Sequence, residues 1–182
     1  MSAIWTYLDP LCFAILPYVA LFVFFMVTIQ RYRSRSFSYT SLSSQFLENR
    51  QHFWAVVPFH YGILAVLAGH LMALLIPREL LAWNGNPLRL YALEITGLAF
   101  AILTVIGLVA SIVRRLNVAK VGRVTTRRDW ILYGMLLFQV VTGIAIAVTL
   151  PWGSSWFAAV ATPYVWSLLK LNPQIDFIAP LP

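Results

Sequence analysis

The chain has 182 residues, of which 60% are hydrophobic, 15% aromatic and only 10% charged, and its mean hydropathy is +0.79. This composition excludes an ordinary soluble domain and indicates a membrane protein. Thirteen Lys and Arg against six Asp and Glu give a net charge of +7, but the cations lie between apolar runs, a pattern that does not indicate nucleic-acid binding. The single cysteine, Cys12, excludes an internal disulfide, covalent haem attachment and four-cysteine metal sites.

Four stretches of the chain lack Asp, Glu, Lys and Arg over a length that crosses a bilayer, which takes about 20 helical residues. They predict spanning helices at about 11–30, 54–76, 95–113 and 130–150. The first has too long an apolar core for a cleaved signal peptide, so we interpret it as a retained anchor. The segment at about 152–170 is rich in Trp and Tyr, which predicts an interfacial segment. The predicted fold class is an all-α polytopic membrane helix bundle, a single membrane domain over 1–182.

The positive charges are distributed unevenly among the loops. Ten of the thirteen Lys and Arg lie in 31–53 and 114–129, and positively charged loops stay on the cytoplasmic side. The N-terminus, the loop at 77–94 and the C-terminus are therefore predicted to lie outside, which an even number of crossings also requires. Two interpretations of the cytoplasmic charges stay open: orientation and lipid contact alone, or docking of a partner, with Arg114 and Arg115 as candidates.

Two histidines within the second predicted helix are the residues best suited to carry chemistry. The segment FHYGILAVLAGH places His60 and His70 within the membrane, where an ionisable group is costly and marks a functional site. Imidazole in a helix bundle is a ligand for haem iron. At about 1.5 Å per residue the two rings are roughly 15 Å apart along the axis, too far for one metal ion but suitable for two haems. The alternative is a pair of histidines that form hydrogen bonds between helices.

Two other groups of residues each have two interpretations. Gly62, Ala65 and Gly69 lie along one line of the second helix, where small residues allow close approach of another helix or of a haem. Met26 and Met135 are either packing residues or thioether ligands. No phosphate-binding glycine loop occurs and the six acids are isolated from one another, so the sequence does not indicate phosphoryl or hydrolytic chemistry.

Several short motifs are shared with one family of membrane proteins. They are Arg31-Tyr32, the segment Ser43–Glu48 (SSQFLE), FHYGILAVLAGH followed by Pro77, Arg114-Arg115-Leu116, and Thr125-Thr126 with Asp129. On these residues the chain resembles the gamma subunit of respiratory nitrate reductase, a membrane cytochrome b, from Tyr18 through Asp129 and beyond. The FHxGIL segment followed by Gly-His is the most specific part of the resemblance.

The resemblance implies a five-helix protein with two bis-histidine b haems, each ligated by one histidine from the second helix and one from the fifth. It implies that His60 ligates the haem nearer the cytoplasm and His70 the haem nearer the outside. Arg89 matches a basic residue that the family has near its quinol site. The sequence ends at Pro182, about where the fifth helix is expected, and has no histidine after His70. Either the second ligand of each haem comes from a further segment or from another chain, or this protein does not hold haem by the family's four-histidine scheme.

The function that the resemblance implies is electron transfer. The subunit is expected in the inner or plasma membrane, oxidising menaquinol or ubiquinol near the outer face and passing electrons to an iron-sulfur subunit on the cytoplasmic side. Nitrate chemistry belongs to a molybdenum subunit and not to this chain. Two alternatives stay open: a haem-free anchor for a soluble complex, and a related cytochrome b subunit of a sulfur-metabolism or heterodisulfide-type complex.

Overall fold

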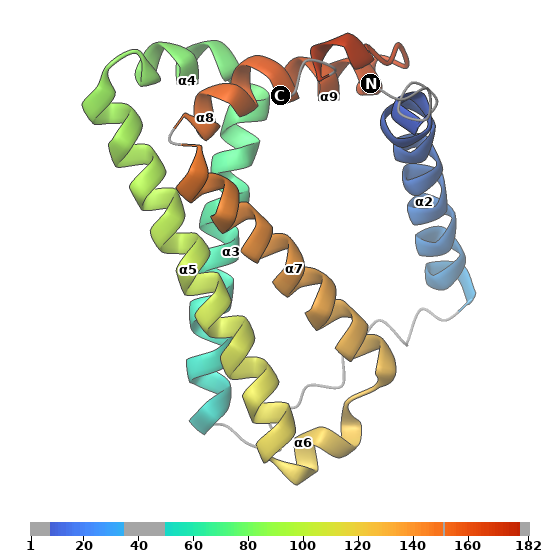
Figure 1. Ribbon diagram of the computed structural model, residues 1–182. Helices are drawn as coiled ribbons and strands as arrows, with labels where there is room; N and C mark the ends of the chain where they lie inside the picture. Colours follow the sequence, from blue (N-terminus) through green and yellow to red (C-terminus); the bar gives the residue numbers. More distant parts are fainter. Residues whose placement is uncertain (1–7, 35–49, 151, 179–182) are drawn as a thin grey trace. The chain divides into compact units, whose positions relative to one another are not determined.

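The computed structural model describes residues 8–34, 50–150 and 152–178, without the side chains of Arg50 and Gln51. Over these residues the fold is helical and contains no strand (Figure 1). Four of the described helices are long and apolar enough to cross a membrane: Leu8–Ser34, His52–Leu75, Pro87–Asn117 and Arg127–Thr149. The predicted fold class and its four spanning helices are therefore confirmed, while the orientation of the N-terminus stays a prediction.

The helices extend beyond the charge-free stretches that predicted them. Helix α3 is Arg50–Leu75, α5 is Pro87–Asn117 and α7 is Arg127–Thr149. Hydropathy marks only the part of a helix that matches the hydrocarbon core, whereas the helix continues until a cap or a proline ends it. Because α3 begins earlier than predicted, Pro58 lies in its interior and not in its first turn.

Local signals account for the starts of the helices that follow α3. Pro77 opens the short helix α4 (Pro77–Asn84), and Pro87 opens α5 behind Asn86, whose side chain accepts from the backbone N–H of Leu88 at 2.9 Å. Helix α7 starts with a capping box in which Thr126 and Asp129 accept from each other's backbone N–H. Between α5 and α7 lies the six-residue helix α6 (Ala119–Val124).

The chain divides into two compact units, Met1–Ser41 with Trp156–Pro182 and Leu42–Ser155. The first unit contains two π-helical segments, η1 (Leu11–Ile15) before α2 (Leu16–Ser34) and η4 (Phe157–Ala161) before α9 (Thr162–Leu169). In both cases the second residue of the following α-helix is proline. A proline cannot donate to the preceding turn and its ring needs space there, which the wider π-turn provides.

Two tyrosines join the first helix of this unit to α9. The Tyr18 hydroxyl donates to the carbonyl of Leu168 at 3.0 Å, and the Tyr164 hydroxyl donates to the carbonyl of Phe13 at 2.6 Å. Burial raises the pKa of Tyr164, and the neighbouring Tyr18 adds to the shift. Tyr164 therefore remains a neutral hydrogen-bond donor at neutral pH. Helix α9 follows directly on η4, so most of the predicted interfacial segment is helical.

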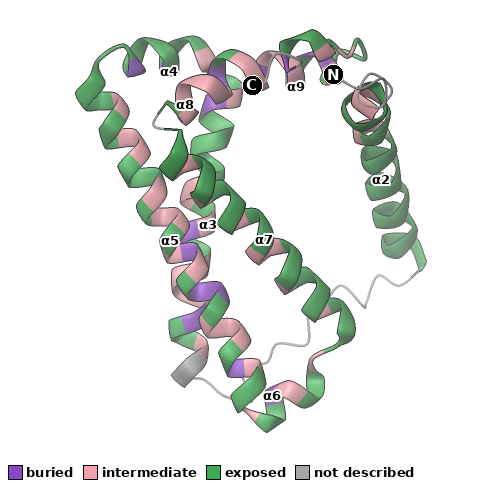
Figure 2. Ribbon diagram, viewed as in Figure 1, coloured by how far each residue is buried: buried purple, intermediate pink, exposed green. Residues whose placement is uncertain are grey.

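The unit Leu42–Ser155 is held together by the packing of α3 along α5. Figure 2 shows that buried residues gather on these two helices, whereas α7 contains no buried residue. Apart from Arg114, the buried positions of this pair are small or medium-sized: Ala55, Gly62, Ala73, Thr104, Gly107 and Leu108. Small residues let helix backbones approach closely, which is how helices associate in lipid.

Two close approaches fix the register of this antiparallel pair. A Cβ atom at Gly62 would lie 2.7 Å from the carbonyl oxygen of Phe100 and closer still to the Thr104 hydroxyl, and one at Gly107 would lie 2.7 Å from the Cα of Phe59. Each step forward along α3 is therefore matched by a step back along α5. We call the two ends of this unit the α4 end, where α3 leads into α5, and the α6 end, where α5 leads into α7.

The Gly107 contact leads to a stability prediction. Gly107→Ala is expected to destabilise the protein by roughly 1 to 3 kcal/mol, because the added methyl meets the backbone of Phe59 and forces the two helices apart. Gly97→Ala on the same helix is the matched control, since its methyl would meet nothing within 4 Å. Thermal unfolding in detergent measures both variants, and equal melting temperatures would contradict the proposed packing role.

Candidate functional site

His60 and His70 both lie on α3 and both are exposed on their unit. The Nδ1 atom of each ring lies 2.8 Å from the backbone carbonyl oxygen four residues earlier, that of Val56 for His60 and that of Val66 for His70. A carbonyl oxygen only accepts, so this contact assigns the proton to Nδ1 and the lone pair to Nε2. Binding of one ring nitrogen to a backbone carbonyl is the usual way in which a protein orients a histidine that ligates metal through the other nitrogen.

The two rings form two separate sites. Ten residues of helix separate them, which is roughly 15 Å along the axis. No group of three or more His, Cys, Asp and Glu that could hold a metal ion occurs among the described residues. Each histidine therefore offers a single nitrogen ligand. That donor fits one axial position of a haem iron and does not form a complete protein site for a bare metal ion.

The line of small residues on α3, formed by Gly62, Ala65 and Gly69, does not lie in one uniform environment. Gly62 is buried against Thr104 and Phe100 of α5, so it is a helix-packing residue. Gly69, beside His70, is exposed, and a Cβ atom there would meet nothing within 4 Å. Only the part of the line next to His70 is therefore open to a flat ligand, and the rest of it belongs to the α3–α5 contact.

Arg89 lies in the first turn of α5, at the α4 end. Its guanidinium carbon is 5.0 Å from the centroid of the Trp83 ring, and both side chains are exposed. This cation–π contact orients the guanidinium at the same end of α3 and α5 as His70. A role of Arg89 in quinol binding stays a prediction.

Arg114 and Arg115, the predicted docking residues, do not project freely from the α6 end. Arg114 is only 4% exposed. Arg115 donates through Nε to the Tyr133 hydroxyl at 3.0 Å and through a terminal nitrogen to the Thr125 hydroxyl at 3.1 Å. Its guanidinium carbon also lies 5.1 Å from the centroid of the Tyr133 ring, so Arg115 joins α5 to α7. The spacing in the sequence indicates the burial of Arg114, because Arg114 lies on the same face of α5 as the buried residues Thr104, Gly107 and Leu108.

A different set of cations is exposed at the α6 end. Its members are Lys120, Arg123, Arg127 and Arg128, on α6 and the first turn of α7. Val121 between them is fully buried, so α6 turns its apolar side inward and its basic side outward. We call these four residues the basic surface of the α6 end. Counting the charges of each loop in the sequence did not distinguish them from Arg114, which is buried, and Arg115, which is hydrogen-bonded.

A polar cluster at the α4 end was not among the site residues predicted from the sequence. It consists of Asn84, Glu94, Ser154 and Ser155. The Asn84 amide donates to the hydroxyl oxygens of Ser154 and Ser155 at 3.1 and 3.0 Å. Glu94 Oε1 accepts from the backbone N–H of Ser154 at 3.2 Å and from its hydroxyl at 2.9 Å. The available sequence signal was Glu94 itself, a carboxylate just before an apolar run.

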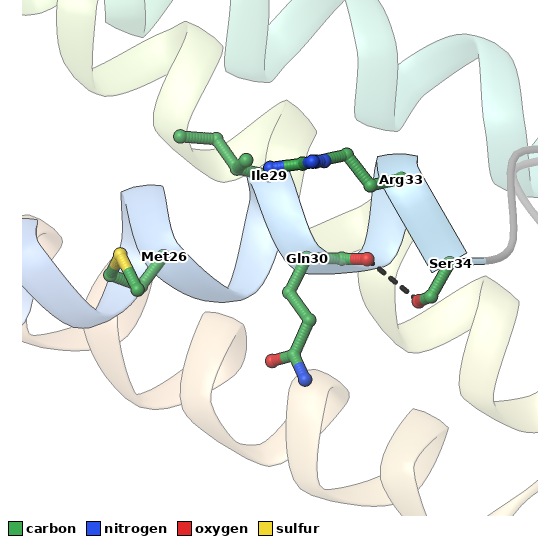
Figure 3. Close-up of a pocket in the computed structure, with 5 residues that line it drawn as sticks. All are labelled: Met26, Ile29, Gln30, Arg33 and Ser34. Atoms are coloured by element: carbon green, nitrogen blue, oxygen red, sulfur yellow. Dashed lines mark hydrogen bonds between the residues drawn. The ribbon is translucent and has the colours of Figure 1, made fainter.

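The surface of α2 offers no comparable arrangement. One shallow pocket is lined by Met26, Ile29, Gln30, Arg33 and Ser34, all of the same helix (Figure 3). Its polar contact is the Ser34 hydroxyl, which donates to the carbonyl of Gln30 at 2.6 Å. Met26 points to the surface with no second ligand-type side chain in this pocket, so the pocket supports packing or lipid contact for Met26.

Comparison with known proteins identifies the family. The model of the family described as nitrate reductase gamma subunit matches residues 9–182. The chain is 33% identical over 133 residues to the nitrate reductase gamma chain of Bacillus subtilis, which covers 72% of this chain and 60% of that protein. It is 31% identical over 153 residues to the respiratory nitrate reductase 2 gamma chain of Escherichia coli, covering 82% of this chain and 66% of that protein.

A third relative is a much longer protein. The nitrate reductase-like protein NarX of Mycobacterium tuberculosis is 31% identical over 178 residues, which is 94% of this chain but 27% of that protein. The chain thus spans 60% and 66% of the two gamma chains above. The segment Ser43–Glu48, which contributes to the resemblance, lies outside the described residues. With a family model that matches nearly its whole length, this chain belongs to the nitrate reductase gamma subunit family.

Proposed function

We propose that this chain is the haem b electron-transfer subunit of a membrane-bound nitrate reductase. In this role it takes electrons from membrane quinol and passes them to an iron-sulfur subunit, which serves a molybdenum subunit where nitrate is reduced. The observation that carries the proposal is the pair of exposed histidines on α3, at two depths, each with Nδ1 bound to its own helix. The family to which the chain belongs supports the same assignment.

His60 and His70 would each hold one haem through Nε2. Two bis-histidine haems need four ligands and the sequence contains three histidines, so at least one ligand would come from elsewhere in the assembled protein. When bound, b haems supply one-electron transfer across the membrane. The protein's own contribution is the fixed orientation of both imidazoles and the open surface at Gly69 beside His70.

The cofactor is tested by a visible spectrum of the complex purified from membranes. We expect a b-type alpha band after dithionite reduction, and about two haems for each copy of this chain because two separate histidines act as ligands. Converting the extracted haem to its pyridine complex measures the amount of haem, which gives the number of haems for each copy of this chain. A purified complex whose reduced spectrum has no alpha band would leave the haem-free anchor as the better interpretation.

The orientation is tested by thiol labelling in intact cells. We propose that the α4 end faces outside, because the positive loops lie at the opposite end. Cys12 is exposed and is first replaced by serine. A cysteine introduced by Glu79→Cys, on α4, is then expected to react with a membrane-impermeant reagent, whereas one introduced by Arg123→Cys, on α6, reacts only after the cells are lysed. The reverse labelling pattern would exchange the sides assigned to the two histidines.

A further inference from the structure

The polar cluster at the α4 end contains a carboxylate that is held at one oxygen and open at the other. Glu94 Oε1 accepts two hydrogen bonds from Ser154, whereas Oε2 accepts none among the described residues. The Glu94 side chain is only half-buried. A carboxylate fixed in this way has one oriented basic site left for a proton.

The same cluster holds a buried polar atom without a partner. Asn84 is 8% exposed, its amide nitrogen donates to both serines, and its Oδ1 has no hydrogen-bond partner among the described residues. Buried acceptors in native proteins are nearly always paired, so this oxygen needs a donor from beyond the part of the chain that the structure describes. A hydroxyl group of a ligand is such a donor.

The register of α3 and α5 brings this cluster to the depth of His70. Gly62 faces Thr104, so ten residues further along α3 and ten back along α5 Met72 lies at the same depth as Glu94. His70 is two residues from Met72, a difference in depth of about 3 Å along the helix. Glu94 is therefore level with His70, the outer histidine, and far from His60.

The azimuths of His70 and Glu94 also agree. At about 100° per residue, His70 lies about 80° round α3 from Gly62, and Glu94 lies about 80° round α5 from Thr104. Because the two helices run antiparallel, both rotations lead to the same side of the pair. Ser154, at the start of α8 (Gly153–Trp156), donates to Glu94. A ligand next to His70 thus has Glu94 as its nearest carboxylate of the α3–α5 pair at that depth.

We propose that Glu94 is the proton acceptor for quinol oxidised beside His70, with Asn84 and Ser154 as positioning residues. This rests on the proposed function. Oxidation of one quinol breaks two O–H bonds and yields one quinone, two protons and two electrons. The electrons go to the b haems. One proton goes to Glu94 Oε2 and from the neutral acid to water outside, and the second follows by the same route once the first has left.

A structural role for Glu94 is separable from proton acceptance. As an acceptor for Ser154, Glu94 caps the start of α8, and the amide oxygen of glutamine accepts the same two hydrogen bonds. Glu94→Gln therefore keeps the cap but removes the base. Glu94→Asp restores a carboxylate, and Glu79→Gln, which alters an exposed acid of α4, is the matched control.

The experiment uses the assembled complex in membranes and menadiol, a soluble naphthoquinol. In Glu94→Gln we expect haem reduction by menadiol to slow by about a hundredfold per haem, as for loss of a general base, with the haem spectrum and the KM for menadiol unchanged. Glu94→Asp recovers part of the rate and Glu79→Gln behaves as the wild type. Infrared difference spectra of menadiol-reduced against oxidised protein should show a carboxyl C=O band that Glu94→Gln lacks.

Two negative results have different meanings. A normal haem spectrum with wild-type menadiol kinetics and an unchanged infrared band in Glu94→Gln would overturn the role of Glu94 while leaving the proposed function intact. A wild-type complex without haem would overturn the proposed function, and this inference with it. Because rates are taken per haem, a lower yield of assembled complex in one variant does not affect either conclusion.

Discussion

Replacement of His70 by leucine is expected to lower the haem content from about two to about one per chain and to stop haem reduction by quinol, because the outer haem loses an axial ligand. Replacement of His60 by leucine should also remove one haem, but the remaining haem should still be reduced by quinol and then fail to pass electrons to the partner. The haem-to-protein ratio and the quinol-reduced spectrum of the complex measure both effects.

The packing alternative makes a different prediction for the same variants. A histidine that only joins helices contributes about 1 to 2 kcal/mol at most, and its loss leaves the cofactor content unchanged. His52→Leu is the matched control, since His52 lies on the same helix, one residue before Phe53 at the α6 end. Full haem content in both the His60 and His70 variants would refute ligation. A loss of haem in the His52 variant as well would point to damage of α3 instead.

The number of membrane-spanning helices was predictable from the sequence because each membrane span requires a long charge-free run. Their ends were not, since α5 begins at Pro87 and ends at Asn117, well outside the run at 95–113. Helix ends depend on hydrogen-bonding caps such as Asn86 and Thr126, which hydropathy does not detect. The π-turn before Pro17 likewise follows from backbone geometry and not from hydropathy.

The site was predictable to the extent that single residues carry it. His60 and His70 stand out because ionisable groups are rare within apolar helices. The polar cluster depends on Glu94 meeting Ser154, 60 residues further along the chain, and no local pattern predicts that contact. For the same reason Arg115 and Arg123 are indistinguishable as charges in one loop, although one is bonded to Tyr133 and the other is exposed.

This distinction changes the prediction for partner docking. Charge reversal at Arg115 would break its hydrogen bonds to Tyr133 and Thr125 and so disturb the bundle itself. Reversal at Arg127 and Arg128, members of the exposed basic surface, avoids this problem. Both lie in the first turn of α7, where cations oppose the helix dipole, so glutamates there favour the helix. Four of the six cations in 114–129 remain, which keeps the predicted orientation.

We therefore expect the double variant Arg127→Glu, Arg128→Glu to insert and bind haem normally but to lose its iron-sulfur partner from the membrane fraction. Like charges placed across an interface cost several kcal/mol, so affinity should fall by about a hundredfold or more. Arg115→Glu should instead lower the melting temperature of the membrane subunit, and Arg78→Glu, exposed at the opposite end, should change neither property. Sedimentation of membranes followed by quantification of the partner gives the answer. Full retention of the partner in the double variant would mean that these arginines only orient the chain, because a docking surface does not tolerate two reversed charges at its centre.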